Sequence, residues 1–282
     1  MPVVSYRMGP HPELLLCHAV VDTPTFAERV AAASSAGVQA LGLDMTRRRR
    51  HHQLGETDES MRRDAAAAGV RVDELWSLYG VLDHTAAART LAYADRLIEV
   101  AASFGALMIG APADFDGDLV AASTLLAEVA DRAARAGVRV GLEPVAFTRL
   151  DDVAVAATIV EACGRDNVGL VLDVWHLCRG RTHLQTIDDL SVAVEVVQLN
   201  DGTVAPSDPD PMVEVGHYRS LPGEGGLDAA GVVRAVVRNR PEVRWSAEVG
   251  TDELAALSPT EAAQRVATAC RQFLTEVVGL DG

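Results

Sequence analysis

The sequence predicts a single (β/α)8 barrel, a TIM barrel, over residues 1–282. Three observations predict it. Short apolar segments alternate with helical patterns eight times, several helices end at a glycine followed by a β-branched strand, and metal-capable side chains stand at the ends of four consecutive strands. The C-terminal ends of parallel barrel strands meet on one rim, where barrel enzymes place the active site.

The expected strands are short and aliphatic. In chain order they are residues 14–19, 38–43, 70–78, 106–109, 138–142, 168–172, 194–199 and 243–247. Continuous apolar runs of this kind are typical of parallel strands that are buried on both faces. An open doubly wound sheet is the alternative, but no GxGxxG sequence follows the first strand, which disfavours dinucleotide binding.

Helices are expected between the strands. A helix over residues 23–36 starts at a threonine N-cap candidate and stops at Gly37, and the segments SSAGVQA, AAAAGV and RAGVRV share this glycine stop. An alanine-rich helix is expected over 86–104 and a last helix over 259–278.

Three segments are expected to form loops. They are 44–58 with the run RRRRHH, the acidic 114–118, and 201–227, which is rich in Pro, Gly and Asp. Long loops at the C-terminal ends of barrel strands carry lids and specificity elements.

Composition excludes several function classes. The chain of 282 residues is 49% hydrophobic, which is enough for a full core, and its net charge of −15 argues against a nucleic-acid partner. The sequence contains no lysine. A Schiff-base aldolase, a covalently held pyridoxal phosphate and a P-loop lysine are therefore excluded.

The sequence also predicts a cytoplasmic protein with no membrane partner. No stretch approaches the roughly 18 apolar residues needed to span a bilayer, and the first 16 residues lack the pattern of a signal peptide. Cys17, Cys163, Cys178 and Cys270 are scattered without a CxxC pair. They are expected to be reduced thiols.

Four side chains at expected strand ends are candidate metal ligands: Glu143, Asp173, Gln198 and Glu248. A helical pattern fits into each gap between them, so the barrel brings them to one rim. Three carboxylates and an amide oxygen form a hard ligand set, which suits one Mg²⁺ or Mn²⁺ ion.

Five motifs identify a resemblance. GLEPV, GLVLDVWH, VVQLND, RSLPGEGGLD and WSAEVG occur in this order between residues 141 and 250. The chain resembles the sugar phosphate isomerase/epimerase superfamily, the xylose-isomerase-like TIM barrels, although its first half matches only in layout. The same scaffold supports isomerases, epimerases, dehydratases and nucleases, so the resemblance does not fix one reaction.

The resemblance implies roles for five residues. Glu143 and Glu248 would bind the metal and act as the acid–base pair on the two faces of the substrate. Asp173 would be a ligand, His176 would donate a hydrogen bond to the substrate, and Arg219 would contact the substrate as the arginine of an R-x-x-P-G-x-G motif. Their alternative roles are structural: strand-end salt bridges for the glutamates and a helix cap for the histidine.

Gln198 departs from the pattern of many members, which place a histidine here in a sequence like V-H-L-K-D, whereas this chain has V-Q-L-N-D. Glutamine at this position, like L-D-V-W-H and R-S-L-P-G-E-G, is similar to the 3-dehydroshikimate dehydratase branch. Asp201 is a candidate neighbour of the ligands.

Further candidates lie in the first half. His18 and Trp76, at the ends of the first and third expected strands, are candidate substrate-binding residues, with a buried core histidine as the alternative for His18. The run Arg47–His52 is either an anion clamp at the mouth or, as we favour, a solvated loop or subunit contact.

The sequence thus predicts a metal-dependent isomerase or epimerase that acts on a sugar-like α-hydroxy ketone by proton transfer through a metal-stabilised enediolate. A dehydratase of a cyclic hydroxy ketone is a close second, because both reactions begin with α-proton abstraction. A non-catalytic metal-binding barrel is a third hypothesis. The charge and the few histidines disfavour the endonuclease relatives, and a homo-oligomer remains an expectation from the resemblance.

Overall fold

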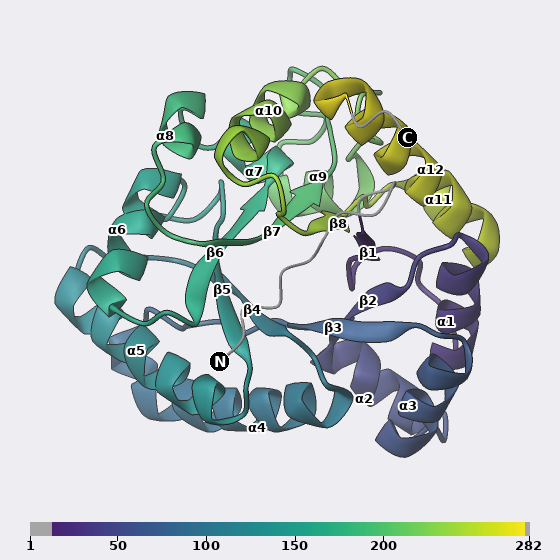
Figure 1. Cartoon of the computed structure of the whole chain (residues 1–282), viewed down its shortest axis with the longest axis horizontal. Helices are drawn as coiled ribbons and strands as arrows, with labels where there is room; N and C mark the ends of the chain where they lie inside the picture. Colours follow the sequence, from purple (N-terminus) through teal and green to yellow (C-terminus); the bar gives the residue numbers. More distant parts are fainter. Residues whose placement is uncertain (1–12, 280–282) are drawn as a thin grey trace.

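The structure, a computed structural model that describes residues 13–279, confirms the predicted barrel. Eight parallel strands pair in chain order, and β8 pairs with β1 to close the barrel (Figure 1). The strands are β1 (Leu14–Leu16), β2 (Ala40–Asp44), β3 (Arg71–Trp76), β4 (Met108–Ala113), β5 (Arg139–Pro144), β6 (Val168–Asp173), β7 (Val194–Leu199) and β8 (Trp245–Ala247).

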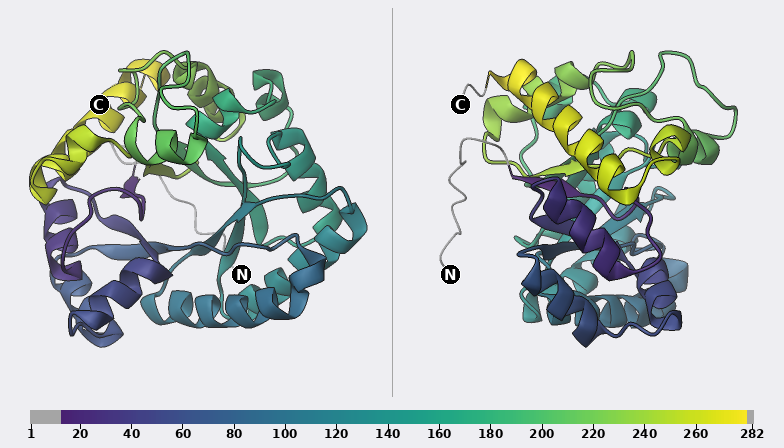
Figure 2. Two further views of the ribbon diagram at one scale, coloured as in Figure 1. Left: turned by 180° about the vertical axis from the view of Figure 1, so that it is seen from behind. Right: turned by 90° about the vertical axis from the view of Figure 1, so that its right-hand side faces the viewer.

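Helices surround the strands as an outer ring (Figure 1). They are α1 (Phe26–Ser35), α2 (Met45–Gln53), α3 (Asp58–Ala67), the 3₁₀ turn η1 (His84–Ala86), α4 (Ala87–Phe104), α5 (Leu119–Arg135), α6 (Val153–Cys163), α7 (Val174–Arg179), α8 (Leu184–Asp188), α9 (Pro211–His217), α10 (Ala229–Asn239), α11 (Asp252–Ala255) and α12 (Pro259–Val278). The last helix packs beside α1, which closes the ring (Figure 2).

Local sequence explains where these helices begin and end. Thr25 caps α1 in a capping box with Glu28, two residues after the expected threonine, and Ser258 caps α12 in the same way. Gly37, Gly69 and Gly137, the three expected helix stops, adopt φ values of 65°, 66° and 73°. A residue without Cβ adopts this left-handed conformation at little cost, so each helix can turn directly into the next strand.

Two expected loops contain helices, so those predictions are wrong in part. Residues 45–53 of the expected loop 44–58 form α2, because Asp44 caps the helix by accepting hydrogen bonds from the backbone of Thr46 and Arg47. The expected loop 201–227 contains α9, which starts at Pro211 behind the cap Asp210.

Strand boundaries differ from expectation at the rim. The first strand ends at Leu16 rather than residue 19, because the backbone N–H of Val20 turns back to the Cys17 carbonyl. β4 continues to Ala113 because its pairing with β5 extends to Ala113 opposite Pro144. The first difference places His18 on a rim loop, and the second brings Pro112 and Ala113 to the rim at the end of a strand, where all three line the cavity described below.

The barrel interior is filled by a small cluster of Trp76, Met108, Val171 and Val196. Gly110 on β4 permits this packing, because a Cβ at that position would lie 2.2 Å from the indole ring of Trp76. The larger core lies between the strands and the helices. The interior below the rim is therefore packed and not a pore.

Within the part of the chain that the structure describes, no helix is long and apolar enough to cross a bilayer. Residues 1–12, which hold most of the segment judged to lack a signal peptide, are outside the described residues.

Candidate active site

The barrel brings the predicted ligands to its C-terminal rim. Glu143, Asp173 and Gln198 stand near the ends of β5, β6 and β7, and Glu248 follows β8 directly. A cavity of about 440 Å³ opens at this rim. Five of the predicted site residues line it together: His18, Trp76, Glu143, His176 and Glu248.

Arg219, the expected substrate contact, lies next to the carboxylates. Its side chain is 1% exposed, with Nη2 at 3.2 Å from Asp173 Oδ2 and Nη1 at 3.5 Å from Glu248 Oε1. Nη1 also donates to the backbone carbonyl of Glu248 at 3.0 Å. The guanidinium therefore supplies buried positive charge to two of the three acidic groups.

The backbone around Arg219 explains how a long loop holds it there. The Arg219 N–H donates to the Gly250 carbonyl, and Ser220 and Asp201 exchange backbone hydrogen bonds. The Asp201 carboxylate accepts from the N–H groups of Gly223 and Leu227. Asp201 thus shapes the turn that follows Arg219.

Asp173 has two structural partners besides Arg219. Its Oδ1 accepts from the backbone N–H of His176 and so caps α7, and its Oδ2 accepts from the Asn200 side chain at 2.7 Å. The cap belongs to the aspartate and not to the histidine. The His176 ring lines the cavity, where Nδ1 accepts from the Ala146 N–H at 3.4 Å and Nε2 lies 3.8 Å from Glu143 Oε1.

The two glutamates bind protons more tightly than ordinary carboxylates. Burial raises the pKa of Glu143 well above its usual value, and the charges of Glu248 and Asp173 raise it further. Burial likewise raises the pKa of Glu248 to about 7, while Arg219 opposes that rise. The carboxylates repel one another, so the site favours a bound proton or cation.

The side-chain oxygens of the four candidate ligands are donors of the type that a hard divalent cation prefers. Gln198 Oε1 and Glu248 Oε2 are buried and accept no hydrogen bond from the described residues, so each retains a lone pair for a ligand. Within residues 13–279, however, no three His, Cys, Asp or Glu side chains are arranged to enclose a metal ion. The side chains fit a divalent ion by donor type, and Arg219 occupies the position beside Asp173 and Glu248.

One wall of the cavity is aromatic. The His18 ring stacks on Trp76 at 5.4 Å between centroids and 22° between planes. Burial lowers the pKa of His18 to about 3 and that of His176 to about 4, so both rings are neutral at pH 7. Both first-half candidates therefore lie where the sequence placed them, at the pocket wall.

Three residues of the site were missed in the sequence. Glu74 is fully buried on β3 and accepts from Trp76 Nε1, Cys17 lies 3.1 Å from His18 Nδ1, and Asn200 binds Asp173. Burial and the charges of Glu248 and Glu74 raise the pKa of the Cys17 thiol, so it is protonated. Only Asn200 had a sequence signal, because it lies in the motif VVQLND.

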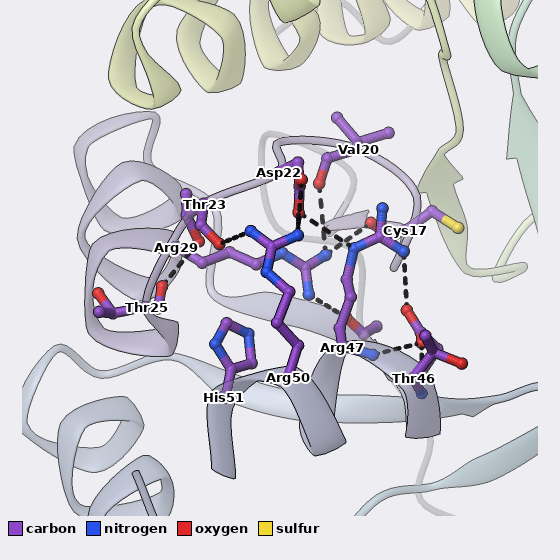
Figure 3. Close-up of polar contacts among 12 residues, drawn as sticks. Cys17, Val20, Asp22, Thr23, Thr25, Arg29, Thr46, Arg47, Arg50 and His51 are labelled. Atoms are coloured by element: carbon purple, nitrogen blue, oxygen red, sulfur yellow. Dashed lines mark hydrogen bonds and ion pairs between the residues drawn. The ribbon is translucent and has the colours of Figure 1, made fainter. Parts of the chain in front are cut away.

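The basic run on α2 is used inside the chain (Figure 3). Arg47 Nη1 binds Asp44 at 2.8 Å, and Arg50 binds the Asp22 carboxylate and the Thr23 carbonyl. The buried Arg29 donates to the carbonyls of Gly42 and Cys17. These contacts tie down the segment 17–25, which carries His18.

Replacing His176 with Gln is expected to reduce the loss of folding stability that the protein shows between pH 7 and pH 4. Between pH 6.5 and 4 the unfolded chain binds a proton on this histidine that the folded protein does not, so wild-type stability is lost as the pH falls through this window. The difference amounts to at most about 3 kcal/mol. Urea unfolding of the metal-free protein at pH 7 and pH 4 measures it. His217→Gln, at an exposed histidine, is the control, and equal pH slopes for wild type and His176→Gln would contradict the assignment.

Comparison with known proteins decides the family. The model of the xylose isomerase-like TIM barrel family matches residues 30–273. The chain belongs to the xylose isomerase-like TIM barrel family. The five sequence motifs and the closed barrel agree with this membership.

Three known proteins are similar to this chain in sequence or in structure. A 3-dehydroshikimate dehydratase of Pseudomonas aeruginosa is 30% identical over 181 residues, which is 62% of this chain and 28% of that protein's length. A crystal structure of IolI with bound zinc has a TM-score of 0.81 at 16% identity, covering 94% of this chain and 99% of that one. An L-ribulose 3-epimerase structure has a TM-score of 0.72 at 16% identity, covering 95% and 96%. The two structures establish the shared fold.

Proposed function

We propose that the protein is a divalent-metal-dependent isomerase or epimerase that moves a proton next to the carbonyl of a sugar-like α-hydroxy ketone. One observation carries the proposal. Glu143 and Glu248 reach the same cavity from β5 and from the end of β8, with the Arg219 guanidinium beside Glu248. Two carboxylates on separate walls can serve the two faces of a substrate.

The acid–base residues have distinct neighbours. Glu248 has one oxygen beside Arg219 and the other without a hydrogen-bond partner, which is suited to accept the carbon-bound proton. Glu143, whose pKa is raised by burial and then by its acidic neighbours, is suited to return a proton on the other face. His176 and Arg219 are donors for the oxygen on which negative charge develops.

We further propose one bound divalent ion, held by the oxygens of Glu143, Asp173, Gln198 and Glu248. When bound, such an ion acts as a Lewis acid toward the carbonyl and hydroxyl oxygens of the substrate. The unpartnered Gln198 oxygen supports it, as does the zinc in the IolI structure. The all-oxygen donor set favours Mg²⁺ or Mn²⁺.

Gln198→His is expected to retain metal binding and to shift preference toward Mn²⁺, Co²⁺ or Zn²⁺. An imidazole nitrogen is a softer ligand than an amide oxygen, and it suits these ions better than Mg²⁺. Isothermal titration of the metal-free protein with each ion measures the preference. An unchanged order of affinities would show that Gln198 is not a ligand.

A second candidate is a dehydratase of a cyclic hydroxy ketone. The 30% identity to a 3-dehydroshikimate dehydratase favours it, and so does the glutamine at position 198. Both reactions begin when a carboxylate removes the α-proton. They differ in whether a β-hydroxyl then leaves the substrate or the proton returns to carbon.

Proton NMR in D₂O with added Mg²⁺ or Mn²⁺ tests both candidates on ketoses, hydroxypyruvate and 3-dehydroshikimate. Deuterium next to the carbonyl together with a new sugar supports the isomerase or epimerase. Aromatic signals from 3-dehydroshikimate support the dehydratase. No reaction with any compound would contradict both and leave the non-catalytic metal-binding barrel as the remaining hypothesis.

A further inference from the structure

The outer half of the cavity is acidic. The loops after β3, β4 and β5 contribute Asp83, Asp114, Asp116 and Arg149 to its lining. Arg149 is the one arginine among the lining residues of the described chain, and its guanidinium binds both oxygens of Asp114 at distances from 2.5 to 3.1 Å. Asp83 and Asp116 therefore leave the outer end of the cavity with net negative charge.

Three arginines of α2 and the buried Arg219 are committed elsewhere. Arg47 and Arg50 pair with Asp44 and Asp22 (Figure 3), and Arg48 binds Asp58 through both oxygens. Arg219 is buried against Asp173 and Glu248. The chain contains no lysine. None of the described residues that line the cavity thus offers an unpaired formal positive charge to an anion. Arg89, which shares a neighbouring pocket with Asp83 and forms no ion pair among residues 13–279, is outside this lining.

The side walls of the cavity are uncharged rings. Trp76 carries the stacked His18 on one side, and Phe147 meets His176 edge-on with 5.4 Å between centroids. Tyr79 also lines the cavity and is 69% exposed. Ring surfaces pack well against the C–H faces of a polyol, while a few polar groups orient it.

We propose that the substrate is an uncharged, unphosphorylated polyhydroxy ketone, held between the ring walls with its carbonyl toward Glu143 and Glu248. This inference rests on the proposed function and specifies its substrate class. A phosphate or carboxylate at the outer end would lose water and meet Asp83 and Asp116 instead of a cation. Because 3-dehydroshikimate carries a carboxylate, the inference favours isomerisation or epimerisation over dehydration.

Matched pairs of compounds test it. Deuterium exchange next to the carbonyl is followed for L-ribulose and L-ribulose 5-phosphate, D-fructose and D-fructose 6-phosphate, and 3-dehydroshikimate. We expect kcat/KM for a neutral ketose to exceed that of its phosphate by at least about tenfold at low salt, with the ratio narrowing as salt screens the rim. Preference for a phosphorylated ketose, or turnover of 3-dehydroshikimate above the neutral ketoses, would overturn the inference while α-proton chemistry stands. No exchange with any compound would overturn the proposed function, and the inference with it.

A charge variant tests the rim directly. Asp114→Asn removes the partner of Arg149, and it is expected to lower several-fold the ratio of kcat/KM for the neutral ketose to kcat/KM for its phosphate, through the KM of the phosphorylated ketose. Asp95→Asn is the matched control, because Asp95 pairs with Arg132 away from the cavity lining. An equal effect of both variants on the phosphorylated ketose would overturn the role of the rim.

Discussion

Glu143→Gln and Glu248→Gln are each expected to lower turnover by about 10²- to 10⁴-fold, with the fold retained. Glutamine preserves the shape and the hydrogen-bonding capacity of the side chain but neither accepts nor returns a proton from carbon. Both residues line the same cavity, so each loss removes one partner of the proposed acid–base pair. Initial rates with the substrate found by deuterium exchange measure the effect, and circular dichroism checks the fold.

Glu195→Gln is the matched control for these two variants. Glu195 is also a buried glutamate on a barrel strand, but it lies at the start of β7 and pairs with Arg139. This variant should lose stability and keep turnover. Activity of Glu143→Gln or Glu248→Gln above about a tenth of wild type would contradict their role as acid and base.

Arg219→Met is expected to lower the free energy of unfolding by about 3–5 kcal/mol in the metal-free protein. The variant leaves Asp173 and Glu248 buried without their guanidinium partner, so their charge repulsion is uncompensated. A divalent ion that binds these carboxylates would restore part of the loss. Urea unfolding with and without Mg²⁺ or Mn²⁺ measures both effects.

Arg238→Met serves as the control, because Arg238 pairs with Asp188 and its own side chain is 60% exposed. An exposed pair contributes only about 0–1 kcal/mol. Equal losses for the two arginine variants would show that Arg219 does not neutralise the buried carboxylates. The absence of any stabilisation by metal would argue against the proposed ion and leave the acid–base roles untouched.

Sequence patterns were enough to predict the barrel and the rim positions of its acidic side chains. Alternation of aliphatic strands with glycine-terminated helices is a local pattern, and Gly37, Gly69 and Gly137 adopt the backbone conformation that this pattern requires. Strand ends are fixed by the same pattern, so the rim positions of Glu143, Asp173 and Glu248 followed from it.

The partners of these side chains could not be predicted from the sequence, because they depend on which segments meet in the folded barrel. Asp173 receives Asn200 and Arg219 from later segments, and Arg50 of α2 pairs with Asp22 of an earlier segment. Arg149, on the loop after β5, pairs with Asp114, on the loop after β4. This ion pair neutralises the arginine and so affects the net charge that the cavity presents. Periodicity reports which face of an element is buried, whereas an ion pair depends on which loops meet. The charge of the site was therefore set by the closure of the barrel and not by any motif.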